Sequence, residues 1–188
     1  MARPKYGDGD LRARKRLIDG FWGALRLSPY EKLSVRGLLR DTGLSKNTFY
    51  YHFADMGDLA RAAIDEITLD DLTQMLLHGE NLDKTRLGSH LGEAEDAQRL
   101  SKIAIVLSRN GSALQPLFIE KLKSAWLDAL GKNGKPASKE KLLLVDFASG
   151  GAVNALAGKN PQEYAETIAI LASTPAIRSF IDNLSSSI

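Results

Sequence analysis

The chain has 188 residues, enough to bury a substantial core, and its 44% hydrophobic and 26% charged residues are ordinary for a globular protein. It contains no apolar run near the roughly 20 residues that a membrane-spanning helix needs, and no apolar signal region follows its N-terminus, so we expect a cytoplasmic protein. The absence of cysteine excludes disulfides, thiolate metal sites and cysteine nucleophiles.

Charge is divided unevenly along the chain. The net charge is only +2, but residues 1–53 hold eleven Lys and Arg against five Asp and Glu, whereas residues 54–188 hold 14 against 18. The formal balance is therefore +6 for the first part and −4 for the second. Such an asymmetry indicates a nucleic-acid-binding end joined to a body that has another task.

The first predicted helix begins after an N-terminal arm of about ten residues, with Asp10 as its N-cap, and ends at Ser28-Pro29. Apolar residues recur along it at helical spacing: Leu11, Leu17, Ile18, Phe21, Trp22 and Leu25. This stripe should pack across the helices that follow. Basic residues cluster near the start, where they oppose the helix dipole, and either a bound anion or plain solvation explains them: Arg12, Arg14, Lys15 and Arg16.

Two short helical patterns joined by a turn come next. Val35, Leu38 and Leu39 repeat at helical spacing until Gly43 stops the first of them. Leu44 lies between the two patterns, as a buried turn residue would. The spacing predicts a helix-turn-helix, although helical hairpins that bind no nucleic acid have similar turns.

The second helix of this pair is predicted to have one apolar and one polar face. Ser45 opens the helix as its N-cap, and Phe49 and Phe53 lie four residues apart, so both dock against the partner helix. The opposite face carries hydrogen-bonding side chains without a carboxylate: Lys46, Asn47, Thr48, Tyr50, Tyr51 and His52. Such side chains suit a polyanion with exposed base edges, although clustered aromatic residues are also typical of a core.

The order, spacing and types of these residues resemble the DNA-binding domain of the TetR family of bacterial repressors over roughly fifty residues. The matching residues are Ser34, Val35, Arg36, Thr42, Gly43, Leu44, Ser45, Lys46, the segment 48–53, Asp58 and Leu59. Gly37 departs from the family pattern, and Met56 stands where many members have a lysine. The resemblance implies an all-α fold. Residues 1–55 would form a three-helix helix-turn-helix DNA-binding domain, and residues 56–188 a linking helix followed by a helical ligand-binding and dimerisation domain.

Family position and side-chain chemistry together assign the expected DNA contacts. Arg36, Lys46 and Asn47 should contact base edges, with Arg and Lys directed to guanine and Asn to adenine. Six residues should mostly bind phosphates: Ser34, Ser45, Thr48, Tyr50, Tyr51 and His52. Two such domains on a symmetric dimer would bind a palindrome whose half-sites lie about one helical turn, or a multiple of it, apart.

The rest of the chain is predicted to consist of successive helices. Asp55 caps the linking helix, and a pattern like a capping box at 68–71 indicates a bend or restart there. A loop or a short helix is expected over 81–92. Further helices are expected around 97–107, 114–130, 138–156, 160–171 and 174–184. The apolar pattern resumes directly after Gly150-Gly151, so one continuous helix is predicted there rather than a break.

In the TetR family two late helices of the body usually form a four-helix bundle with those of a second subunit, which places the dimer interface within residues 138–173. The interface candidates are Phe147, Ala148, Gly150, Gly151, Ala152, Ala155, Tyr164 and Ile168. The resemblance also implies a small hydrophobic effector. Candidate pocket residues, although apolar residues at such spacing more often form plain core, are Met75, Leu76, Phe118, Trp126 and Phe147.

The predicted function is therefore a sequence-specific DNA-binding transcriptional regulator, a homodimeric repressor released from a palindromic operator by a small-molecule effector. The alternative is a DNA-organising or protein-docking module that has the same DNA-binding domain and needs no ligand. The clustered acidic residues and the three histidines, His52, His78 and His90, lack the spacing of a catalytic or metal-binding motif. We therefore expect neither an enzyme nor a bound metal, cofactor or membrane.

Overall fold

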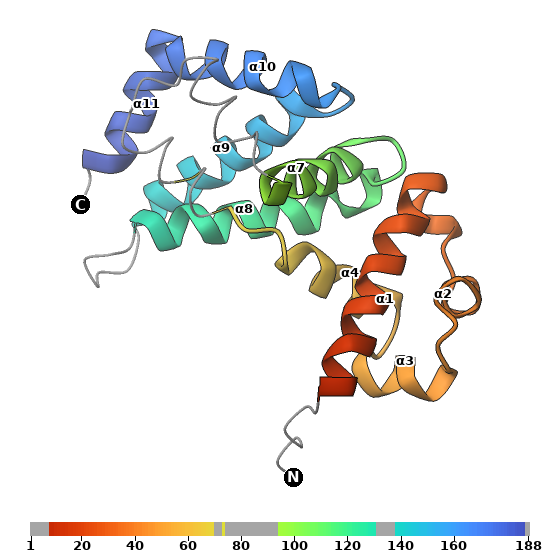
Figure 1. The fold of residues 1–188 in the computed structure, drawn as a ribbon. Helices are drawn as coiled ribbons and strands as arrows, with labels where there is room; N and C mark the ends of the chain where they lie inside the picture. The colour runs from red at the N-terminus through yellow and green to blue at the C-terminus, as the bar shows by residue number, and fades with distance from the viewer. Residues whose placement is uncertain (1–7, 70–72, 74–93, 131–137, 187–188) are drawn as a thin grey trace.

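The computed structural model describes residues 8–69, 73, 94–130 and 138–186, and the elements in these ranges are all helices. The predicted all-α fold is confirmed for this part of the chain. Figure 1 shows the N-terminal helices as a group on the right, beside a larger group formed by the later helices. Among the described residues, no helix combines the length and the hydropathy that crossing a membrane requires.

Three helices form what we call the head, residues 8–55. They are α1 (Asp8–Leu27), α2 (Val35–Thr42) and α3 (Lys46–His52), with a 3-10 turn η1 (Tyr30–Lys32) after α1. Helix α1 packs against both α2 and α3 (Figure 1). The predicted N-cap at Asp10 was wrong, because α1 already includes Asp8. The predicted apolar stripe is buried from Leu17 onward, whereas Leu11 is 53% exposed.

Side-chain caps fix the ends of α2 and α3. The Ser34 hydroxyl accepts a hydrogen bond from the Gly37 amide at 3.2 Å, and the Ser45 hydroxyl accepts one from the Thr48 amide at 3.1 Å. Gly43 ends α2 with a φ of 64°, a left-handed conformation that glycine adopts without strain. The predicted stop at Gly43 and the predicted cap at Ser45 are both confirmed.

The linking helix α4 (Met56–Asp65) joins the head to the later helices. The Asp55 carboxylate caps it as predicted, accepting from the Asp58 amide at 2.8 Å. Its buried residues pack against α1 on one side and against α8 on the other: Leu59, Ala60, Ala63 and Ile64. The predicted capping box at 68–71 lies largely outside the described residues, as does the predicted loop or short helix at 81–92.

The later helices form what we call the body. They are α7 (Ala94–Leu107), η2 (Ser112–Leu114), α8 (Gln115–Leu130), α9 (Lys139–Leu156), α10 (Pro161–Ser173) and α11 (Pro175–Ser186). Helix α8 packs along α9, and α10 contacts α11, α9 and α7. As predicted, α9 runs through Gly150 and Gly151 without a break. A reciprocal capping box opens α10, with Asn160 and Glu163 each accepting from the other's amide, at 3.1 and 2.8 Å.

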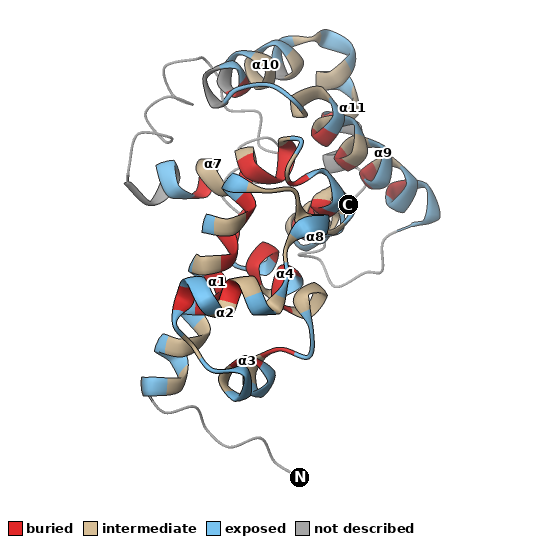
Figure 2. Cartoon of the chain, turned by 90° about the vertical axis from the view of Figure 1, so that its right-hand side faces the viewer, coloured by how far each residue is buried: buried red, intermediate tan, exposed pale blue. Residues whose placement is uncertain are grey.

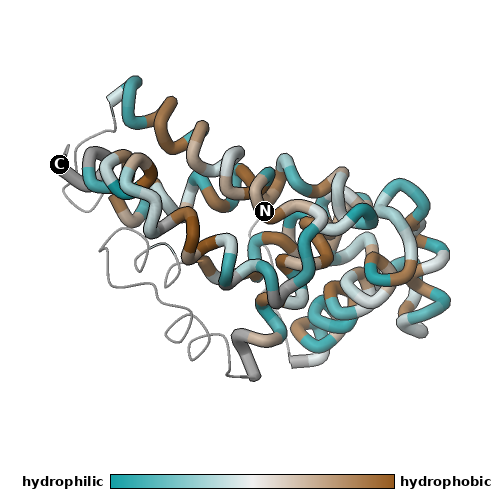
Figure 3. Tube along the Cα trace, turned by 90° about the horizontal axis from the view of Figure 1, so that it is seen from above, coloured by the Kyte–Doolittle hydropathy of each residue, from teal (hydrophilic) through white to brown (hydrophobic). Residues whose placement is uncertain are grey.

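The main hydrophobic core is continuous from the head into the body. One cluster contains Phe21 of α1, Phe49 of α3, Ile64 of α4, Phe118 of α8 and Tyr164 of α10. It therefore crosses the predicted domain boundary after residue 55. A second, smaller cluster holds the end of α8 against α9 and α11: Trp126, Leu130, Val145 and Ile181. Figure 2 shows the buried residues on the inner faces of the helices, and Figure 3 shows hydrophobic and hydrophilic segments alternating along them.

Candidate nucleic-acid interface

Helix α3 is held in one rotational position by its two phenylalanines. Phe49 is fully buried and Phe53 is 3% exposed, and their ring centroids are 6.0 Å apart. The guanidinium of Arg14, on α1, lies 5.6 Å from the centroid of the Phe53 ring. Because these contacts occupy one side of α3, its opposite side faces solvent, as the spacing predicted.

The outward side of α3 carries exposed polar and aromatic side chains and no carboxylate. Figure 2 shows much of this helix in the colour of exposed residues. Lys46 and Asn47 lie in its first turn. Tyr50 and Tyr51 are 50% and 51% exposed, and the Lys46 ammonium lies 5.8 Å from the centroid of the Tyr50 ring. Half-exposed aromatic rings beside a cation form a surface that can contact both phosphates and bases.

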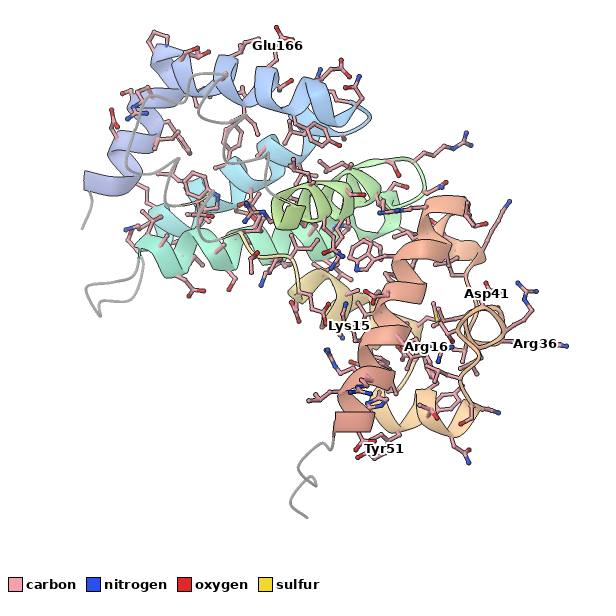
Figure 4. The ribbon with its side chains drawn as sticks, in the orientation of Figure 1. Lys15, Arg16, Arg36, Asp41, Tyr51 and Glu166 are labelled. Carbon is pink, nitrogen blue, oxygen red and sulfur yellow. The ribbon has the colours of Figure 1, made fainter. Side chains whose placement is uncertain are left out.

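Helix α2 adds an exposed cation next to this surface. Figure 4 shows Arg36 extending from α2 away from α1, and it forms no ion pair with the described residues. The next arginine on α2 is different. Arg40 pairs with Asp41 at 2.9 Å, which raises the pKa of the Arg40 guanidinium above its usual value. The charge of Arg36 is therefore available to an anion, whereas that of Arg40 is partly neutralised.

Three hydroxyls that were predicted to bind phosphate already form hydrogen bonds within the head, those of Ser34, Ser45 and Thr48. Ser34 caps α2, and Ser45 caps α3. The Ser45 and Thr48 hydroxyls are also hydrogen-bonded to each other at 2.8 Å. A phosphate contact from any of these residues would therefore share an oxygen that a helix cap already uses.

His52 does not lie where a phosphate contact would require. Both of its ring nitrogens are buried, and its ring packs edge-on against that of Tyr51, with centroids 4.9 Å apart. Burial lowers the pKa of His52 below its ordinary 6.5; Asp10 acts in the opposite direction and Arg14 in the same one. The predicted phosphate contact of His52 is corrected, because neither ring nitrogen is accessible to solvent.

The basic cluster at the start of α1 is only partly neutralised within the chain. Arg14 pairs with Glu66 of the α4 C-cap at 3.0 Å, and Lys15 pairs with Asp19 at 3.0 Å. Arg12 and Arg16 are exposed and form no ion pair with the described residues. Figure 4 shows Arg16 between α1 and α2. The head therefore carries unpaired cations on all three of its helices: Arg12, Arg16, Arg36 and Lys46.

No protein-family model matches the chain, and a comparison with curated proteins finds no match either.

The described candidates for the effector pocket, Phe118, Trp126 and Phe147, do not lie together in the structure. Phe118 and Trp126 are buried, at 4% and 6% exposure, but they belong to two separate hydrophobic clusters. Phe147 lies on the outer side of α9 and is 75% exposed. The prediction was wrong for Phe118 and Trp126 because α8 buries them against different neighbours, and wrong for Phe147 because its side chain is exposed on α9. Met75 and Leu76 lie outside the described residues.

Among the predicted interface residues, those on α9 are partly or largely exposed, whereas Tyr164 is buried. Phe147 is largely exposed, and a side chain on either Gly150 or Gly151 would meet no atom within 4 Å. Tyr164 is 2% exposed and belongs to the main core, so its proposed place in an interface is corrected. The remaining candidates are half-buried: Ala148, Ala152, Ala155 and Ile168.

A groove of about 700 Å³, which the sequence did not predict, lies between the end of α1 and one face of α7. The residues that line it are Arg26, Ala97, Leu100, Ser101, Ala104, Ile105, Ser108, Arg109 and Asn110. Small residues at helical spacing were the available signal, since Ala97, Ser101, Ala104 and Ser108 share one face of α7. That spacing is also common in packed helices, and it does not indicate which element lies opposite.

Proposed function

We propose that this chain is a sequence-specific DNA-binding transcriptional regulator of the TetR type, acting as a homodimer on a palindromic operator in double-stranded DNA. The observation that carries the proposal is the outward face of α3. It combines Lys46, Asn47, Tyr50 and Tyr51 on a helix whose opposite face is fixed in the core, and it includes no carboxylate.

The dimensions and charges of the head support contact with a DNA major groove. An α-helix with its side chains is about 10–12 Å in diameter and the major groove is about 12 Å wide, so α3 can lie in it. Lys46 and Asn47 lie in its first turn, the part of a recognition helix that contacts base edges. Arg36 and Arg16 add positive charge beside it, which favours the phosphate backbone.

The exposed apolar residues of α9 support the dimer. Leu142, Leu143 and Phe147 are 45%, 61% and 75% exposed. Gly150 and Gly151 follow on the same helix, with open space where side chains would be. Burying this surface against a second copy would remove a large apolar area from water. The two heads of such a dimer would then each bind one half-site of a palindrome.

Selection of bound duplexes from a random pool tests this function. The expected result is one enriched palindromic sequence, bound more weakly as salt rises because phosphate contacts release counterions. A variant with Lys46→Ala and Asn47→Ala should lose the enrichment, whereas Lys32→Ala, at an exposed lysine on η1, should retain it. Salt-sensitive binding without enrichment would favour a DNA-organising module, and no binding at low salt would reject the proposal.

A further inference from the structure

The groove between α1 and α7 is open to solvent and is lined by both aliphatic and polar residues. Its aliphatic residues, here called the floor, are Ala97, Leu100, Ala104 and Ile105, and none of the described residues that line it is aromatic. Its volume of about 700 Å³ lies within the range of about 300–1,000 Å³ that is usual for small-molecule sites. The groove can therefore take an aliphatic chain lying along α7.

Two arginines, and no carboxylate among the described residues, line this groove. One Arg26 nitrogen donates to the Ser101 hydroxyl at 2.8 Å. The exposed guanidinium of Arg109 forms neither an ion pair nor a side-chain hydrogen bond with the described residues. An occupant with a negative charge would therefore meet two guanidinium groups that form no ion pair with the described acidic side chains.

Two carbonyl oxygens near the groove, those of Arg26 and Ile105, would repel an anion but already accept hydrogen bonds. The Arg26 carbonyl accepts from the Asn110 side-chain amide at 3.2 Å. The Ile105 carbonyl accepts from both the amide and the hydroxyl of Ser108, at 3.2 and 2.7 Å. These contacts reduce the negative charge that helix C-termini would otherwise direct toward the groove.

We propose that this groove binds an aliphatic monocarboxylate, with its carboxylate held by Arg26 and Arg109 and its chain along the floor formed by α7. A guanidinium matches the two oxygens of a carboxylate, and such charge-assisted hydrogen bonds are stronger than neutral ones. An uncharged chain would leave both guanidinium groups unused. A ligand rich in hydroxyls would find no partners along the floor.

The groove also lies at the junction of the head and the body. Asn110 connects the two, because its side chain donates to the Arg26 carbonyl and its own carbonyl accepts from the Tyr30 amide at 3.0 Å. A carboxylate on Arg26 competes with Ser101 for the same guanidinium. Binding thus changes contacts that hold α1 and η1 on the body. This regulatory role, as effector of the DNA-binding head, rests on the function proposed above.

Isothermal titration of the full chain with octanoate tests the site without DNA. We expect saturable binding of octanoate and none of acetate or octanol, which lack the chain or the charge. Arg26→Gln and Arg109→Gln should each weaken octanoate binding about tenfold or more, the loss expected for one charge-assisted hydrogen bond. Arg61→Gln, at an exposed arginine of α4 outside the groove, should leave it unchanged. Ala97→Trp, at an exposed position, should weaken binding by filling the groove.

Octanoate binding that is absent, or equally strong in both groove variants, overturns the site. The regulatory role is tested on the duplex recovered by selection, where octanoate should change the DNA affinity of the wild type but not that of Arg109→Gln. An unchanged affinity with octanoate bound overturns the regulatory role and leaves the site supported. A chain that binds no DNA contradicts the proposed function, and the titration still decides the groove.

Discussion

Individual side chains of the head differ in what they should contribute to DNA recognition. Arg36→Ala and Asn47→Ala should reduce the preference for the selected duplex by about 1–3 kcal/mol each, because each removes a side chain able to form paired hydrogen bonds with a base. Tyr50→Phe removes only a hydroxyl, and it should weaken binding to all duplexes alike. Gel-shift titrations on selected and scrambled duplexes measure both effects. Equal losses on the two duplexes for Arg36→Ala would remove it from the base-contacting set.

The buried ring of His52 should make the stability of the chain depend on pH. Because burial holds its folded pKa below the ordinary 6.5, the unfolded chain binds more protons as the pH falls through 6.5. Stability should therefore decrease with falling pH until His52 is protonated in both states. Thermal unfolding between about pH 7.5 and about pH 5 should show a smaller loss for His52→Gln than for the wild type. Parallel curves for the two proteins would contradict this.

The sequence predicted some side chains of the head well and others poorly, for a physical reason. Phe49 and Phe53 are apolar and four residues apart, so their burial follows from helical spacing alone. His52 is amphipathic and lies between the two phenylalanine positions. Its orientation depends on how α1 crosses α3, beside Asp10 and Arg14, and this tertiary contact leaves no trace in local sequence.

At the scale of elements, Gly20 sets how closely α1 and α2 approach. A side-chain carbon there would clash with the Thr42 methyl and lie 3.2 Å from a Leu38 methyl. Thr42 cannot easily rotate away, because its hydroxyl donates to the Leu38 carbonyl at 2.7 Å within the core. Gly20→Ala should destabilise the chain by about 1–3 kcal/mol. The clash should outweigh the roughly 1 kcal/mol that alanine gains over glycine in a helix.

Gly23, one turn later on the same helix, provides the matched control. A side-chain carbon there meets nothing within 4 Å, so Gly23→Ala should stabilise the chain by up to about 1 kcal/mol. Denaturant midpoints measure both variants. If Gly20→Ala stabilised the chain as much as Gly23→Ala does, the close approach of α1 and α2 would be disproved.

Element boundaries were predictable where a side chain caps the helix. The caps at Ser45, Asp55 and Ser138 and the capping box at Asn160 follow from local residue patterns, and the structure contains all four. The start of α1 was wrong because several polar residues there can each begin a helix. The groove beside α7 was not predicted, because it forms where the end of α1 lies opposite α7 and local sequence does not indicate this arrangement.

For the whole molecule, the exposed apolar face of α9 should decide the oligomeric state. Leu143→Glu and Phe147→Glu should each shift the proposed dimer toward monomer, because a buried carboxylate would lack a partner. Leu27→Glu is the matched control, since Leu27 is 85% exposed and lies at the end of α1. Analytical ultracentrifugation measures the shift. A wild-type chain that is monomeric at all concentrations would contradict the dimer.

The predicted division into two domains at residue 55 stays a prediction, and the sequence did not indicate that one hydrophobic core would cross this boundary. Hydrophobic periodicity places residues on the inner side of a helix and does not indicate which helices share a core. Phe118 and Trp126 illustrate this, since they lie on one helix and pack into different clusters.

The continuous core limits where this protein could be divided into separate fragments. Phe21 and Phe49 of the head share one cluster with Ile64, Phe118 and Tyr164, so a cut after residue 55 would expose apolar surface on both fragments. The head is therefore not a domain that can be transferred to another protein on its own. A chimera that joins it to a foreign body would need α4 and the face of α8 beneath it to remain folded.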